Sequence, residues 1–289
     1  MAVMAAASTM VAAAAAGAQT IPFADTEDAS LSEIDIDDRA RAWHPVLSFD
    51  IRNGDYARGA YDDDDAGLDR LPVHVSFGGA VILRRRADGD GTLFVIGQSS
   101  NGFHAPGRDE RVRPRAWYES NNLVGLAWRP AQGLTTAITY AIKTSPNGVA
   151  PTTHELSLTS LYATDSGLGR LKPRLAVTRR TRGGGGVYTL AGVTPSFALT
   201  RRENGPKLGI PATIGIGWTD FYAPNTQTRL SGNGGLSLSQ PIRLGGAKAT
   251  IQAEVLALVR DDRLRRLDAP NGTTAAVVPH ATVSLTMAW

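Results

Sequence analysis

The chain of 289 residues has no cysteine, and no long apolar segment typical of a membrane-spanning helix recurs along it. The absence of cysteine leaves no disulfide framework and fits an exported protein that avoids thiol oxidation. The formal charge is +3 and the pI about 9.3. There is no basic helix, no zinc-ligand spacing and no aromatic stacking platform, so we expect no nucleic-acid partner. Anionic lipid headgroups or an anion-favouring pore account for the same charge.

Motifs for metals and cofactors are also missing. The five histidines stand apart in the sequence, and the acidic run Asp62-Asp63-Asp64-Asp65 lacks the ligand order of an EF-hand. Gly183 to Gly186 is not followed by Lys-Ser/Thr, which excludes a phosphate-binding loop. We therefore predict no cofactor and no metal site, and interpret the acidic run as a solvated loop or a weak divalent-cation contact with lipopolysaccharide.

Alternation of apolar and small or polar residues is abundant. The last seven residues, Val283 to Trp289, alternate in this way and end on an aromatic side chain. Such a segment has one face suited to an apolar environment and one suited to a wet or crowded interior. About twelve segments follow this rule: the stretch around 47–51, then 73–83, 93–98, 117–128, 134–143, 155–162, 171–180, 188–201, 212–222, 234–242, 248–260 and 279–289.

The connections between these segments alternate in length. Those after even-numbered segments are short, as at 87–91 and 130–133, and those after odd-numbered segments are longer, as at 53–70 and 261–274. Short turns at one rim and long loops at the other are typical of an outer-membrane barrel with both termini in the periplasm. The short connection at 181–186 is an exception.

The competing fold is a soluble β-sandwich or a lipocalin-like barrel, which alternation alone does not exclude. Aromatic residues near the segment ends, such as Trp43, Trp117, Trp128 and Trp289, favour an interfacial girdle. We therefore predict an all-β fold: a transmembrane antiparallel up-and-down β-barrel of about twelve strands.

The chain divides into three predicted parts. Residues 1–18 form an Ala-rich run that ends in Ala16-Gly17-Ala18, a signal-peptidase pattern, although no Lys or Arg precedes it. Residues 19–42 form an acidic periplasmic lead-in, with a short helix considered near Leu31 to Arg41. Residues 43–289 form the transmembrane barrel, so the expected location is the bacterial outer membrane.

The whole pattern resembles Gram-negative outer-membrane β-barrel proteins. Met287-Ala288-Trp289 is similar to the C-terminal signal that such proteins present for assembly, with Val283, Leu285, Met287 and Trp289 on one face. The strings Trp117 to Asn122, Thr144 to Gly148 and Thr153 to Glu155 resemble uncharacterised porins of proteobacteria. The resemblance implies a fold, a location and the barrel assembly machinery, outer-membrane lipids and lipopolysaccharide as partners, but it assigns no reaction.

A local string raises the question of an enzyme. Gln98-Ser99-Ser100-Asn101-Gly102 is similar to the His-x-Ser-Asn-Gly stretch of outer-membrane phospholipase A. A base two residues before a serine lies beside it on one strand face. Gln98 replaces that histidine and cannot accept a proton, so Ser100 is a weak candidate nucleophile for a lipid hydrolase.

The predicted lumen carries more cations than carboxylates. A positive lining favours anions, whereas the same charges could form a salt-bridged plug in a structural barrel. We expect a passive porin-like channel for small polar or anionic solutes. The predicted lining residues are Arg52, His74, Glu119, Arg129, Lys143, Glu155, Lys172, Arg174, Arg180, Gln252 and Glu254.

Overall fold

The computed structural model describes residues 19–22, 33–36, 42–62, 66–85, 91–107, 110, 112–202, 204–268 and 273–289. The predicted signal segment 1–18 and most of the acidic run at 62–65 lie outside these ranges. No helix in the described part of the chain is both long and apolar enough to cross a membrane.

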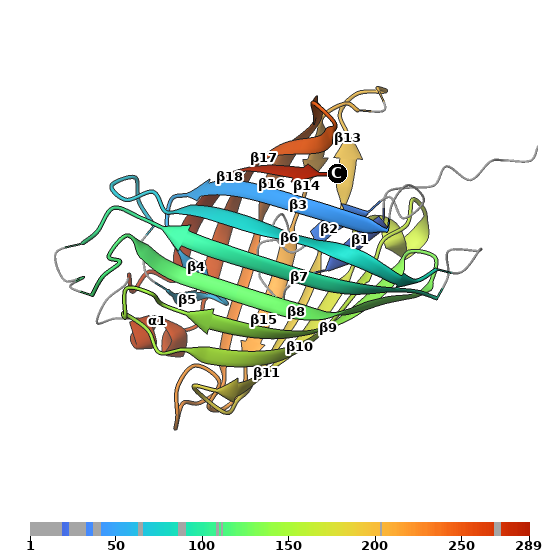
Figure 1. Cartoon of the computed structure of the whole chain (residues 1–289). Coiled ribbons are helices and arrows are strands. Elements are labelled where there is room, and N and C mark those ends of the chain that lie inside the picture. Colours follow the sequence, from blue (N-terminus) through green and yellow to red (C-terminus); the bar gives the residue numbers. More distant parts are fainter. Residues whose placement is uncertain are drawn as a thin grey trace, which may run out of the picture.

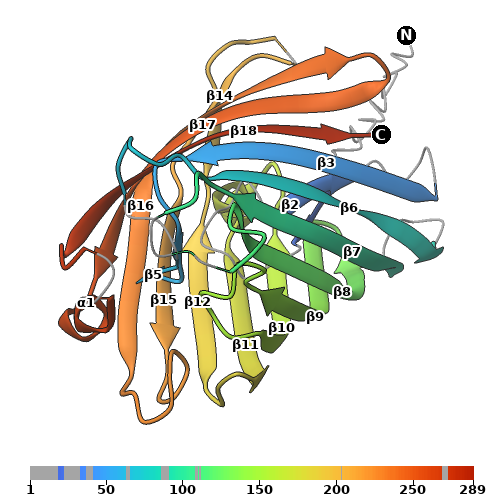
Figure 2. The ribbon, with the colours of Figure 1, turned by 60° about the vertical axis from the view of Figure 1, so that its left-hand side comes forward.

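Twelve antiparallel strands form one closed barrel (Figures 1 and 2). They are β3 (Trp43–Arg52), β6 (Val73–Arg84), β7 (Thr92–Phe103), β8 (Trp117–Ala131), β9 (Leu134–Thr144), β10 (Thr153–Tyr162), β11 (Arg174–Arg182), β12 (Val187–Val193), β15 (Ala212–Gly217), β16 (Arg229–Leu244), β17 (Ala247–Arg260) and β18 (Val277–Ala288). Each pairs with the next along the chain, and β18 pairs with β3 to close the ring. The predicted all-β antiparallel barrel is thereby confirmed.

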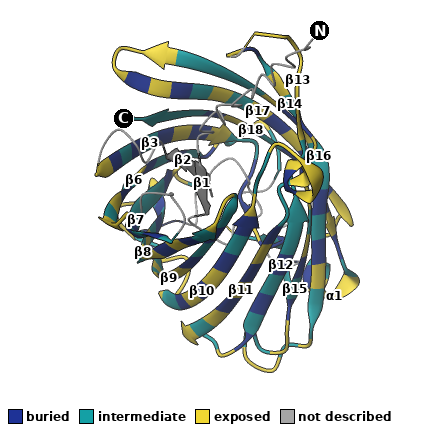
Figure 3. Cartoon of the chain, turned by 90° about the vertical axis from the view of Figure 1, so that its right-hand side faces the viewer, coloured by how far each residue is buried: buried dark blue, intermediate teal, exposed yellow. Residues whose placement is uncertain are grey.

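Side-chain alternation sorts the wall into two faces, as the sequence predicts. On β9, Thr135, Ala137 and Thr139 are buried, whereas Ile138 and Tyr140 are exposed on the outer surface (Figure 3). Most large exposed hydrophobic side chains of the wall belong to the alternate residues of each strand that point to the outer surface. A broad apolar outer surface around a polar interior is the arrangement of a barrel built for a lipid environment.

The seam between the first and last wall strands keeps this pattern. Leu285 lies opposite Phe49, and Met287 lies opposite Leu47, in an unbroken register from 282 to 288. In the inward register next to them, Ser284 lies opposite Asp50 and both are buried. Val283, Leu285, Met287 and Trp289 thus occupy the outward register that the sequence predicts for the assembly signal, whose recognition remains a prediction.

Aromatic side chains gather at both rims. Trp43, Trp128, Tyr162 and Trp289 are exposed at the rim where the chain enters and leaves the barrel, and Trp117 stacks on Phe103 at the other rim. Trp117 and Trp128 are eleven residues apart on β8, which gives roughly 36 Å along the strand. A strand tilt of about 40° reduces this to a height of roughly 28 Å, close to the thickness of a hydrocarbon layer.

The two rims differ as predicted. The rim holding the ends of the barrel chain has short turns, such as Gln132-Gly133 and Gly245-Gly246, although a 3-10 helix, η1 (Gly167–Leu171), lengthens the turn between β10 and β11. The opposite rim has longer loops, one of which contains α1 (Asp262–Asp268). We call these the short-turn rim and the long-loop rim.

Two predicted strands end earlier than expected. The segment 188–201 ends as a wall strand at Val193, because Pro195 cannot donate a ladder hydrogen bond. The chain then forms an additional hairpin of β13 (Ser196–Ala198) and β14 (Lys207–Gly209), which pairs with β16 beyond the end of β15. β15 likewise ends at Gly217 rather than at residue 222.

A small ribbon precedes the barrel and crosses its bore. β1 (Gln19–Pro22) pairs with β2 (Glu33–Ile36), so a strand occupies part of the region considered for a short helix. β1 lies against β9 and β10, while β2 lies against β18, on the opposite side of the ring (Figure 1). The ribbon therefore spans the lumen between opposite walls.

The apolar outer surface predicts a depth-dependent cost for charge. Val255, at mid-height on β17, is 59% exposed, and Val277, at the strand end on the long-loop rim, is 52% exposed. In lipid vesicles, Val255→Arg should lower the unfolding free energy by about 2–4 kcal/mol and Val277→Arg by about 0–1 kcal/mol, since desolvation of the guanidinium is greatest at the bilayer centre. Denaturant titration monitored by tryptophan fluorescence measures both, and equal small effects would contradict a lipid-facing surface.

Candidate functional site

The first long loop folds into the barrel instead of extending from the rim. Its strands β4 (Tyr56–Ala57) and β5 (Ala60–Tyr61) form a hairpin whose two turn residues, Arg58 and Gly59, both have positive φ. This is the backbone of a tight type I′ turn, which requires φ above zero at both central positions. We call residues 53–62 the inserted loop.

The tip of the inserted loop presses against the opposite wall. A Cβ on Gly59 would lie 2.3 Å from the Ser231 Cβ on β16, so only glycine fits there. The Arg58 carbonyl accepts hydrogen bonds from the hydroxyls of Tyr222 at 2.7 Å and Ser231 at 3.3 Å. These contacts hold the non-glycine residue Arg58 in its left-handed conformation, which costs about 1–2 kcal/mol without such support.

The Arg58 side chain makes the central ion pair of the lumen. Its two terminal nitrogens donate to the two oxygens of the Glu155 carboxylate on β10 at 2.8 and 2.7 Å. Both residues are buried, and the guanidinium also lies 5.2 Å from the ring centre of Tyr188 and 5.0 Å from that of Phe221. A bidentate, stacked geometry is what an arginine provides and a lysine does not.

Two further cations share the same carboxylate. Lys143 Nζ on β9 lies 3.1 Å from Glu155 Oε2, and Arg180 Nη2 on β11 lies 3.1 Å from Oε1. Within this group of four, three positive charges face one negative charge, which leaves an excess of two. We call it the cationic group. It lines one side of the lumen below the long-loop rim.

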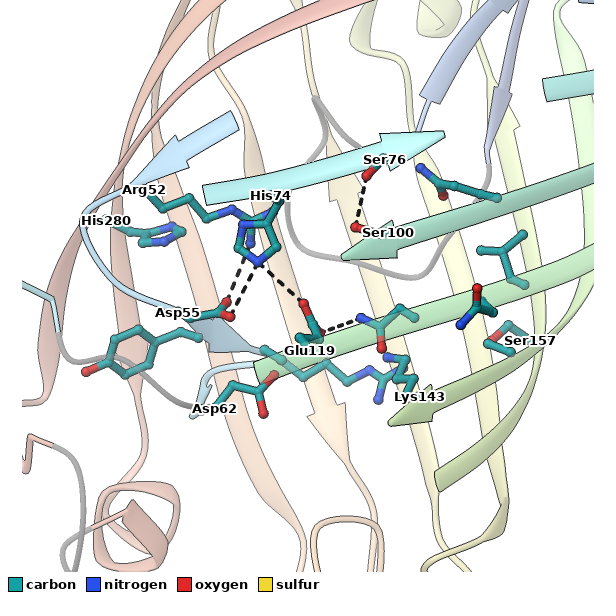
Figure 4. Close-up of a pocket in the computed structure, with 18 of the residues that line it drawn as sticks. Arg52, Asp55, Asp62, His74, Ser76, Ser100, Glu119, Lys143, Ser157 and His280 are labelled. Carbon is teal, nitrogen blue, oxygen red and sulfur yellow. Dashed lines mark hydrogen bonds and ion pairs between the residues drawn. The ribbon is translucent and has the colours of Figure 1, made fainter. Parts of the chain in front are cut away.

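The neighbouring arc of the wall carries an acidic group, shown in Figure 4. His74 on β6 lies between three carboxylates: its Nδ1 is 3.2 Å from Asp50 Oδ1, and its Nε2 is 3.6 Å from Asp55 Oδ2 and 3.4 Å from Glu119 Oε2. The Tyr118 hydroxyl donates to Asp55 Oδ2 at 2.6 Å and lies 2.7 Å from His74 Nε2. Asp55 comes from the inserted loop, and the others come from wall strands.

Two local features of the wall make this group possible. The register of β7 and β8 shifts between Gly102 and Phe103, so Tyr118 is an extra residue on β8. This β-bulge turns two consecutive side chains, Tyr118 and Glu119, toward His74. A Cβ on Gly102 would lie 2.7 Å from the Tyr118 ring and 3.0 Å from His74 Nε2, so this position must lack a side chain.

Asp55 is ionised in this environment. Burial alone would raise the pKa of the Asp55 carboxyl, but hydrogen bonding and charge attraction from His74, together with Arg52 and Tyr118, outweigh burial and hold the pKa below its usual range. Arg52 Nη1 lies 3.5 Å from Asp55 Oδ1, and Arg52 Nε lies 2.6 Å from Asp50 Oδ1. The inserted loop therefore brings a charged carboxylate, not a neutral acid, into the barrel.

Two cavities flank the inserted loop. The inner one, of about 130 Å³, is lined by His74, Ser76 and Ser100 among others, and the outer one, of about 370 Å³, is lined by Arg180 and by the 144–153 loop region. Four charged residues, Arg58, Asp62, Glu119 and Lys143, line both cavities. The inserted loop and these charged side chains thus form the constriction between an outer vestibule and an inner chamber.

The remaining predicted lining residues lie elsewhere. Arg129, Arg174 and Glu254 are buried and Gln252 is half-buried, but none of these four lines either cavity. Arg129 lies 5.2 Å from the Phe94 ring centre, beside an inward-facing apolar cluster that includes Val46 and Ile96. Lys172 has φ 48° in the turn before β11, so it is not part of a wall strand.

Ser100 faces the lumen, not the lipid. Its hydroxyl accepts a hydrogen bond from Ser76 at 2.9 Å (Figure 4). Gln98 lines the same cavity as Ser100. Among the described residues no histidine is hydrogen-bonded to Ser100. A serine without an adjacent base is not an activated nucleophile.

Sequence reasoning did not find Asp55, Arg58 or Tyr118. The first two belong to a connection that is interpreted as an external loop, and Tyr118 depends on a bulge that alternation does not reveal. A weak signal was present: Tyr56-Ala57 and Ala60-Tyr61 mirror each other around Arg58-Gly59, which is unusual for a solvated loop.

Comparisons with known proteins add little to this picture. No protein-family model matches the chain, and no curated protein matches it. One solved structure to which the chain is similar is a "Bacterial polysaccharide outer membrane secretin", with 12% sequence identity and a TM-score of 0.43. The match covers 86% of this chain and 98% of that one.

The cationic group predicts a large effect of removing its single carboxylate. Glu155→Gln leaves Arg58, Lys143 and Arg180 without their shared counter-ion, so we expect the unfolding free energy to fall by about 3–5 kcal/mol. Asp165→Asn, at an exposed position in the turn before β11, should change it by less than about 0.5 kcal/mol. Equilibrium unfolding in detergent compares the two variants, and similar values would show that the pairing is not structurally important.

Proposed function

We propose that the protein is an outer-membrane channel that admits small anionic solutes through its long-loop mouth. The supporting observation is the cationic group, whose four residues carry a net charge of plus two and which places Arg58 and Lys143 at the constriction, beside the carboxylates of Asp62 and Glu119. A positive constriction lowers the barrier for anions and raises it for cations. The apolar outer surface and the two aromatic girdles support the membrane location.

The cavity sizes support a narrow range of solutes. The vestibule volume of about 370 Å³ is near the lower end of the range for small-molecule sites, and the inner chamber of about 130 Å³ is smaller still. An inner chamber of this volume is too small for a drug-sized molecule. Small anions, hydrated or paired with Lys143, are the solutes that match both the space and the charge.

A second function, a plugged structural barrel, has its own support. The β1–β2 ribbon lies between opposite walls, and Val46, Phe94 and Ile96 project inward in the same half of the barrel. An apolar inward cluster hinders ion passage because it cannot replace the hydration shell of an ion. If the β1–β2 ribbon can leave the lumen, the barrel is a closed channel that can open. If it cannot, the barrel is permanently filled.

Ion selectivity tests the channel directly. In planar bilayers under a salt gradient, Lys143→Glu should shift the reversal potential toward cation preference, because it replaces a positive charge that lines both cavities by a negative one. Lys207→Glu makes the same charge change at an exposed position on β14 that lines neither cavity, and should leave the reversal potential unchanged. Identical reversal potentials for wild type and Lys143→Glu would contradict an anion path through the constriction.

Removal of the ribbon separates the two functions. A chain lacking residues 19–36 but retaining 1–18 should show a larger single-channel conductance than the full chain, because the span between β10 and β18 is cleared. Shortening the connection between β13 and β14 at the same rim, where residues 199–202 are exposed, is the matched control and should leave conductance unchanged. If neither the full chain nor the chain lacking residues 19–36 conducts, the protein is a plugged structural barrel and not a channel.

A further inference from the structure

We propose that His74, Asp55 and Glu119 form a binding site for one zinc ion in the wall of the inner chamber. No metal-ligand spacing in the sequence predicts this site, because its three residues come from β6, the inserted loop and β8. The proposal does not depend on ion passage through the barrel. It concerns a ligand of the lumen that the channel function does not require.

The distances fit the metal. One ligand atom of each residue lies within 4.8 Å of the other two. His74 Nε2 is 3.4 Å from Glu119 Oε2 and 3.6 Å from Asp55 Oδ2. Zinc binds nitrogen and carboxylate oxygen at 2.0–2.2 Å, so neighbouring ligands of a tetrahedral ion are roughly 3.3–3.6 Å apart. The two measured separations fall in this range.

A second observation is the orientation of the imidazole. His74 Nδ1 lies 3.2 Å from Asp50 Oδ1, and both side chains are buried. A histidine that donates Nδ1–H to a carboxylate presents Nε2 to a metal, and this outer carboxylate also fixes the plane of the ring. Asp50 is held in turn by Arg52 at 2.6 Å. The histidine is therefore positioned as it is in zinc proteins.

Charge provides the third argument. In the metal-free chain, the three carboxylates of Asp50, Asp55 and Glu119 face the two cations Arg52 and His74, which leaves a net charge of minus one. A metal ion would displace the proton from His74 Nε2, and the residues around it would then carry a net charge of minus two. A divalent cation neutralises this charge. A nitrogen ligand favours zinc over magnesium or calcium, which bind oxygen ligands almost exclusively.

The site is accessible and can be completed. All three ligands line the inner chamber, so an ion from the lumen reaches them (Figure 4). The Tyr118 hydroxyl, within 2.7 Å of His74 Nε2 and 2.6 Å of Asp55 Oδ2, is the neutral oxygen nearest to the ligands. It is placed to hydrogen-bond a metal-bound water or to become the fourth ligand. Zinc would then fix the inserted loop to the wall.

Metal titration of the purified full chain tests the proposal. Protein without a polyhistidine tag is treated with a chelator in detergent, exchanged into clean buffer and titrated with zinc chloride. We expect one zinc ion per chain by elemental analysis, and loss of this ion in His74→Ala and Glu119→Gln. Asp50→Asn should retain one ion with about 10–100-fold weaker affinity, since it removes only the outer hydrogen bond.

Controls distinguish this site from adventitious binding. His154→Ala removes a histidine that contacts Tyr140 outside the lumen, and it should bind zinc as the wild type does. Cobalt chloride on the wild-type chain should give the strong visible absorption of a tetrahedral centre, which does not depend on any variant folding. The proposal is overturned if the wild type retains no zinc, if His74→Ala binds it equally well, or if excess magnesium displaces it.

Discussion

The interior of this barrel depends on the bidentate pair between Arg58 and Glu155. A buried carboxylate with one partner removed would face a large desolvation cost, and a left-handed arginine at a hairpin tip is unfavourable by itself. The ion pair offsets both of these costs, because the loop places the Arg58 guanidinium against the Glu155 carboxylate of the wall. The pair fixes how far the inserted loop enters the lumen. That depth in turn places Asp55 beside His74 and divides the interior into two cavities.

The closed ring imposes the second constraint. Most backbone groups of the wall pair with those of neighbouring strands. The backbone therefore needs little water on either face, and the side chains decide what each face contacts. Outward leucine, isoleucine and valine form the apolar surface, and inward serine, threonine and charged residues must satisfy one another. The ion pairs of the lumen are the consequence. They replace the water that a wider barrel would hold.

Much of the wall follows from local sequence, whereas the site does not. Alternation locates nearly every wall strand because a one-residue slip would turn its apolar side chains into the lumen. It fails at residues 194–201, where Pro195 ends the strand and a hairpin follows. It cannot predict that residues 53–62 fold inward, since this depends on contacts with β10 and β16 that are far away in the sequence. Nor can it show the bulge that aims Tyr118 and Glu119 at the same histidine.

The two charged groups lie on neighbouring arcs of the wall and influence the same space. Asn121 separates them: it donates to Glu119, and its neighbour across the ladder is Lys143. Without a metal, the acidic group partly cancels the attraction of the cationic group for an anion in the inner chamber. A bound divalent cation would neutralise the acidic group and so reduce the negative charge that opposes the cationic group. The two proposals are therefore linked by Coulomb interaction across one narrow lumen, and metal occupancy would strengthen anion preference instead of opposing it.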